Sequence, residues 1–151
     1  MKVNFGIVDN YALTYEGWHI DLHNNFDFVG FDYNVEERKI KLNWKKSSGD
    51  WVDKNEFSSL VLTHKAVTFF RVIEQDEKNT YNDDSCCLGE ITFFPSTERE
   101  TNDSIVLQSK PKDGDDVIYF FENGQQIRIH CEEIELNVKT DTNKRFCHQA
   151  G

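Results

Sequence analysis

The segment 38–46 alternates between apolar and polar side chains at every second position. Ile40, Leu42 and Trp44 alternate with three lysines and an asparagine, at positions 39, 41, 43 and 45. This period of two is the spacing at which successive side chains of a β-strand point to opposite faces of a sheet. The pattern therefore predicts a half-buried strand, with one face in a hydrophobic core and the other in water.

The same period recurs along most of the chain. Further strands are predicted at 29–35, 60–63, 67–73, 90–94, 105–108, 117–121 and 126–138. Alanine occurs only three times, whereas Val, Ile, Phe, Tyr, Trp and Thr make up about a third of the residues, a composition that suits strands. We expect an all-β fold, a single antiparallel β-sandwich or partly closed barrel of about eight to nine strands with little helix. Within this fold, the segment 9–17 could hold a helical turn.

Turn residues and changes of parity indicate how these strands connect. Glu36 and Glu37 form a polar turn between two alternating runs, and a bulge is expected near Gly30, where the apolar parity changes. The dipeptide Asn123-Gly124 predicts a hairpin with a type I′ turn. The parity of the apolar residues changes again near 132–133, so the last long run is expected to break there and cross between two sheets.

Charge and length limit the kinds of partner. The 151 residues suffice for one domain, predicted at 1–138, with 139–151 as a flexible tail. The 17 basic and 27 acidic residues give a net charge of −10, which disfavours nucleic acid and anionic membranes. We find no export signal and no apolar run near the roughly 20 residues that span a bilayer. A cytoplasmic location with reduced cysteines is therefore expected.

One group of residues has the composition of a metal site. His19, Asp21 and His23 occupy alternate positions, so on a strand they would share one face within reach of one divalent metal ion. The alternative is that they form the solvated side of an edge strand whose other side is buried. Common nucleotide, hydrolase and metalloprotease motifs are absent, and the carboxylates near Asp115 and Asp116 suit solvated turns. We therefore expect a non-catalytic protein without a cofactor, with a metal- or small-ligand-binding domain, enzymatic or not, as the alternative.

Aromatic residues near predicted loops suggest a surface for protein binding. Trp51, Phe57 and Tyr81 flank loops, and Asp83 and Asp84 would supply an acidic rim. Exposed aromatic anchors beside a charged rim are typical of protein interfaces, and the acidic charge would attract a basic partner. The alternative is that Trp51 and Phe57 cap the open end of the core.

The segments 31–44, 60–69 and 121–129 together resemble small, acidic, cytoplasmic β-rich domains of uncharacterised bacterial proteins, including some immunity proteins of toxin systems. The resemblance spans roughly 26–138 and rests on strand patterning, so it assigns no functional residue. It implies a protein that neutralises a toxin by covering its active site. An acidic surface would suit a basic nuclease.

Overall fold

The computed structural model describes residues 1–49, 52, 57–75, 82–100 and 108–140. Within them the chain forms β1 (Lys2–Val3), β2 (Gly6–Val8), β3 (Ala12–Tyr15), β4 (Trp18–Asp21), α1 (Leu22–Asn25), β5 (Phe26–Asn34), β6 (Lys39–Lys46), β7 (Ser59–Lys65), β8 (Phe69–Ile73), η1 (Asp83–Cys86), β9 (Leu88–Pro95), η2 (Ser96–Glu98), β10 (Asp115–Phe121), β11 (Gln126–His130) and β12 (Glu133–Lys139). The predicted all-β class is confirmed, but the described residues contain twelve strands rather than eight or nine, because several short strands near the N-terminus show no alternation long enough to be recognised. The strand expected at 105–108 and the tail expected at 139–151 lie almost entirely outside the described residues.

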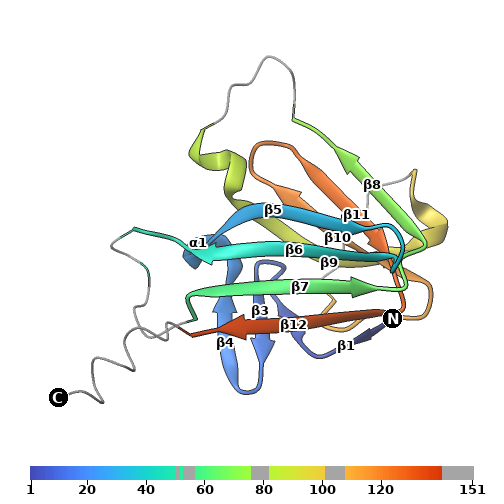
Figure 1. Ribbon diagram of the computed structural model, residues 1–151, viewed down its shortest axis with the longest axis horizontal. Helices are drawn as coiled ribbons and strands as arrows, with labels where there is room; N and C mark the ends of the chain where they lie inside the picture. Colours follow the sequence, from blue (N-terminus) through green and yellow to red (C-terminus); the bar gives the residue numbers. More distant parts are fainter. Residues whose placement is uncertain (50–51, 53–56, 76–81, 101–107, 141–151) are drawn as a thin grey trace.

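The strands form three sheets, of which two are stacked. The five-stranded sheet has the order β1-β12-β7-β6-β5, and the four-stranded sheet has the order β8-β11-β10-β9. Figure 1 shows the first lying over the second, with the three-stranded sheet β2-β3-β4 along one side. Each sheet has two distinct end strands within the described chain, so the fold is an open sandwich rather than a barrel. No helix in the described part of the chain is long and apolar enough to cross a membrane.

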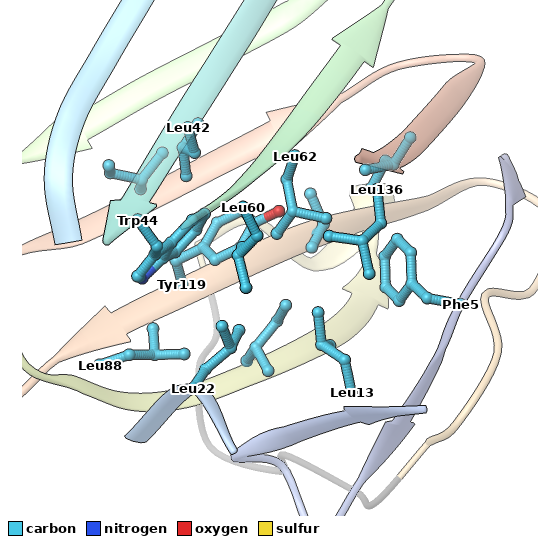
Figure 2. Packing of buried hydrophobic residues seen from close by; sticks show 14 of the residues in the cluster. Phe5, Leu13, Leu22, Leu42, Trp44, Leu60, Leu62, Leu88, Tyr119 and Leu136 are labelled. Carbon is cyan, nitrogen blue, oxygen red and sulfur yellow. The ribbon is translucent and has the colours of Figure 1, made fainter. Parts of the chain in front are cut away.

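The core lies between the stacked sheets. Ile40, Leu42 and Trp44 of β6 are at most 1% exposed, which confirms the alternation that predicted this strand. Across the core, Tyr119 of β10 packs near the Trp44 ring, with ring centroids 6.0 Å apart. Figure 2 shows Trp44 and Tyr119 among leucines of the surrounding elements, with Phe5 nearby. Burial of this contiguous apolar surface is the main stabilising contribution to the fold.

Two predicted irregularities are present where the sequence placed them. The β5–β6 pairing shifts register between Phe28 and Gly30, so the expected bulge is confirmed. Gly30 has φ 147°, a backbone conformation that residues with a Cβ rarely adopt. The run 126–138 breaks after His130, and its two halves, β11 and β12, belong to different sheets. The change of parity therefore marks the point at which the chain passes from one sheet of the sandwich to the other.

Two local predictions were wrong. The β10–β11 hairpin forms, but a type I′ turn at Asn123-Gly124 would require a positive φ at both residues. Of the two, only Gly124 has a positive φ (95°). The Phe121 N–H donates to the Gln125 carbonyl, which closes a three-residue loop at 122–124, and the Gly124 N–H donates to the Phe121 carbonyl within it. The segment 9–17 contains strand β3 instead of a helical turn. A pair of adjacent positive φ values lies on each side of this strand, at Asp9 and Asn10 before it and at Glu16 and Gly17 after it.

A buried histidine joins the two stacked sheets. His64 of β7 is fully buried, and its Nδ1 lies 3.0 Å from the Ile40 carbonyl oxygen. Because a carbonyl only accepts, Nδ1 carries the proton, and Nε2 accepts the hydrogen bond from the Tyr119 hydroxyl at 2.8 Å. Burial lowers the pKa of His64 to about 4, although backbone hydrogen bonds oppose this effect. The imidazole is therefore neutral at physiological pH.

The expectation that Asp115 and Asp116 lie in a solvated turn was wrong. Both are in β10, and Asp116 is fully buried. Arg99 donates two hydrogen bonds to its carboxylate, at 2.9 and 3.0 Å, Arg128 donates one at 2.7 Å, and His130 donates one at 2.8 Å. Burial alone would raise the pKa of Asp116, but these hydrogen bonds outweigh it and lower the pKa. Asp116 is the anionic centre of a buried ion cluster.

Candidate functional site

Of the partner-binding surface predicted from the sequence, the structure describes one side chain, that of Phe57. Phe57 is only 8% exposed and packs edge-on against Trp18, with ring centroids 5.2 Å apart, so the expectation that it is an exposed anchor was wrong. Trp51 and Tyr81 lie outside the described residues. Asp83 and Asp84 are in η1, but their side chains are not among those described. Of these candidates, Phe57 fits the alternative reading as a cap on the core.

The predicted alternation of His19, Asp21 and His23 ends before its third residue. Strand β4 stops at Asp21, whose carboxylate accepts hydrogen bonds from the Asn24 backbone and side chain, both at 2.8 Å. Asp21 is thus the N-cap of α1, a role typical of aspartate. His23 lies inside this helical turn rather than on the strand face. The three residues therefore do not share one face of a strand.

A different surface stands out by its exposed apolar side chains. Six large hydrophobic residues of the described chain are substantially exposed, and four of them fall between positions 29 and 35. They are Val29 (61% exposed), Phe31 (39%), Tyr33 (44%) and Val35 (70%). Single exposed apolar residues are common, but a contiguous row of them marks an interaction site.

The position of β5 in its sheet explains this exposure. Phe31 and Tyr33 pair with Leu42 and Ile40 of β6, so they point to the core side of the sheet. Strand β5 ends one sheet and β8 ends the other, on the same side of the sandwich (Figure 1). Phe70 of β8 contacts both rings, edge-on to Phe31 at 5.3 Å and stacked on Tyr33 at 5.7 Å. We call Val29, Phe31, Tyr33, Val35 and Phe70 the open edge.

Two pockets lie beside the open edge. The first has a volume of about 340 Å³ and lies where the β5 bulge faces the end of β8, η1 and the β10–β11 loop. Its apolar wall is formed by Phe28, Val29 and Phe31, and its polar wall includes Glu74. The second has a volume of about 580 Å³ and lies along the β5–β6 hairpin, lined by residues that include Asp32, Tyr33, Val35 and Lys41. A pocket therefore lies near each end of β5.

Carboxylates accompany these apolar groups. Asp32 is exposed between Phe31 and Tyr33, and its carboxylate accepts a hydrogen bond from Asn43 at 3.1 Å. Glu74 is exposed at the first pocket, where it accepts a hydrogen bond from Gln125 at 3.2 Å. An apolar wall with a carboxylate at its rim suits the aliphatic stem and charged head of lysine or arginine. The open edge therefore has the chemistry to hold an extended segment with apolar and basic side chains.

The sequence missed this site because alternation does not distinguish a covered face from an uncovered one. The run 29–35 has the same period as 39–45, yet the apolar face of the second run is buried and that of the first is open. The unusual signal was the density of aromatic and β-branched residues around the bulge glycine. Comparisons with family models, with curated proteins and with solved structures found no match for this chain.

Proposed function

We propose that this protein is a binding module that takes up an extended segment of a basic partner protein along β5. The observation that carries the proposal is that β5, nine residues long, ends its sheet and bears a row of exposed apolar side chains. An edge strand has backbone N–H and C=O groups that do not bond within its sheet, and an added strand satisfies them. The partner segment would become the sixth strand of the five-stranded sheet.

The side chains of the open edge would provide specificity. In strand addition, backbone hydrogen bonds supply affinity, and pockets for alternate side chains select the sequence. Phe31, Tyr33 and Phe70 offer an aromatic contact at the centre, with a pocket toward each end of β5. A lysine or arginine of the partner would place its stem against Phe31 and its charge near Glu74. The preferred segment would alternate apolar and basic residues.

Charge favours a basic partner over a second copy of this chain. Each chain carries a net charge of −10, so two copies repel one another during encounter, whereas a basic protein is attracted. The resemblance to immunity proteins is compatible with a basic enzyme as the partner. In that case the module would inhibit by covering the enzyme's active site, and no catalytic residue would be needed in this chain.

Binding of selected peptides tests the proposal. We expect a library of random linear peptides, selected on the purified protein, to yield sequences that alternate apolar residues with lysine or arginine. Phe31→Ala combined with Tyr33→Ala is expected to weaken binding about tenfold or more, because buried aromatic contacts dominate interface energetics. Glu74→Lys is expected to weaken binding of the basic peptides, and added salt is expected to weaken it in the wild type.

Matched variants distinguish the open edge from the rest of the surface. Trp18→Ala removes an aromatic side chain that is 48% exposed on β4, and Glu90→Lys reverses an exposed charge on β9. Neither is expected to change the affinity of the selected peptides. Peptides that bind the Phe31→Ala, Tyr33→Ala variant as tightly as the wild type, while both proteins melt at similar temperatures, would overturn the proposal.

A further inference from the structure

Three side chains with different donor atoms meet near the first pocket, whose lining includes the chain neighbours Cys86 and Asn123 but none of the three residues themselves. His23 comes from α1, Cys87 lies between η1 and β9, and Glu122 begins the β10–β11 loop. The imidazole nitrogen, the sulfur and a carboxylate oxygen all lie within 4.8 Å of one another. Within the described residues this is the group of histidine, cysteine and carboxylate side chains that could hold a metal ion.

The separations of these donor atoms fit tetrahedral coordination. His23 Nδ1 is 3.5 Å from Cys87 Sγ and 3.7 Å from Glu122 Oε1. A tetrahedral zinc ion with ordinary bond lengths to sulfur, nitrogen and oxygen separates its ligand atoms by about 3.4 to 3.6 Å. Two of the three separations are therefore close to those of a tetrahedral site, and the third, between the sulfur and the carboxylate, is within 4.8 Å.

The same geometry argues against a cysteine nucleophile. In a catalytic triad the thiol and the carboxylate contact different ring nitrogens, so that one orients the base while the other is activated. Here Cys87 Sγ and Glu122 Oε1 both approach Nδ1 of His23. Nδ1 also lies 2.6 Å from the Leu88 carbonyl oxygen, to which it donates. Because the sulfur and the carboxylate approach the same ring nitrogen, the arrangement suits coordination of a shared metal ion better than proton transfer through the imidazole.

The backbone around the group is held firmly. The Glu122 N–H donates to the Cys87 carbonyl at 2.9 Å, which fixes two of the three segments to one another. His23 is fixed through the helical turn that Asp21 caps. Gly89 leaves room for the Glu122 carboxylate, because a Cβ at position 89 would lie 3.2 Å from Glu122 Oε1. Preorganised ligands lower the conformational cost of metal binding.

We propose that His23, Cys87 and Glu122 bind a divalent transition-metal ion of the zinc class. A thiolate, an imidazole and a carboxylate together favour zinc over magnesium or calcium, which prefer oxygen ligands. Binding replaces the hydrogen bond from Nδ1 to Leu88, so the imidazole proton moves by way of solvent from Nδ1 to Nε2, and the thiol proton of Cys87 is released to solvent. The fourth coordination position is left for water, since the side chain of Glu122 is 44% exposed.

Metal titration of the full chain tests this site. We expect the protein to bind one zinc ion in calorimetry, and cobalt(II) to produce the charge-transfer absorption of a metal–thiolate bond. Cys87→Ser and His23→Ala are each expected to weaken zinc binding about tenfold or more, because each removes a ligand. Cys86→Ser and His19→Ala are matched controls, since each alters the same residue type nearby but outside the group. Both controls are expected to bind zinc as the wild type does.

Two outcomes would overturn the site. One is a cobalt(II) complex without thiolate absorption, and the other is equal weakening by Cys86→Ser and Cys87→Ser. Thermal unfolding of each variant without metal establishes that it is folded before its affinity is compared. The result is independent of peptide binding, because none of the three ligands belongs to the open edge.

Discussion

Replacing Asp116 by alanine is expected to lower the free energy of unfolding by about 3–5 kcal/mol, because it leaves buried positive charge without its counter-charge. Arg128 is fully buried like Asp116, and its Nε donates to the carboxylate at 2.7 Å. Arg99 adds two further hydrogen bonds. A loss of this size is a large share of the roughly 5–15 kcal/mol that stabilises a typical domain. Urea denaturation followed by circular dichroism measures it.

Two comparisons isolate the cause of this loss. Asp113→Ala removes an exposed carboxylate two residues before β10 and is expected to change the free energy of unfolding by no more than about 0.5 kcal/mol. Asp116→Leu combined with Arg128→Met removes both charges of the buried pair and is expected to be more stable than Asp116→Leu alone. If Asp116→Ala cost no more than Asp113→Ala, the buried ion cluster would not stabilise the fold.

Acidification from pH 6.5 to pH 4 is expected to remove about 3 kcal/mol of stability through His64 alone. Burial lowers the pKa of this histidine from 6.5 to about 4, so the unfolded chain binds more protons than the native protein throughout this range. The free energy of unfolding therefore rises with pH between 4 and 6.5 and falls as the pH is lowered. Tyr119 and Cys131 do not titrate there, since burial raises both of their pKa values.

A variant that cannot titrate tests the assignment to His64. His64→Gln is expected to be less stable than the wild type at pH 7, because it disturbs the hydrogen bond with Tyr119. Its free energy of unfolding should nevertheless change less between pH 6.5 and 4. His19→Gln, at an exposed position, should retain the wild-type dependence on pH. Equal acid losses in the wild type and His64→Gln would assign the effect to other groups.

Much of the fold could be predicted from local pattern. The strand around Ile40, the bulge at Gly30 and the crossing after His130 each depend on the alternation of neighbouring side chains, which the sequence displays directly. The turn at Asn123 could not be read in this way, because a three-residue loop satisfies the same hairpin with one positive φ. Asp116 was misplaced because its arginine partners are distant in sequence and cannot be recognised from its neighbours.

The candidate sites depend even more on tertiary arrangement. His23 was recognised as a metal ligand candidate, but the sequence joined it to His19 and Asp21 because they are adjacent along the chain. Cys87 and Glu122 approach it only after α1, β9 and the β10–β11 loop come together. The open edge was missed for a related reason. Nothing in the period of 29–35 shows that β5 ends its sheet.

The decisive measurement is a titration of isotope-labelled protein with a selected peptide, followed by amide chemical shifts and by nuclear Overhauser contacts between the two chains. Binding along β5 predicts the largest shifts at residues 29–35 and in β8, with cross-strand contacts between the peptide backbone and β5. Shifts centred on β4 around Trp18, with β5 unchanged, would contradict the proposed binding surface and the function built on it.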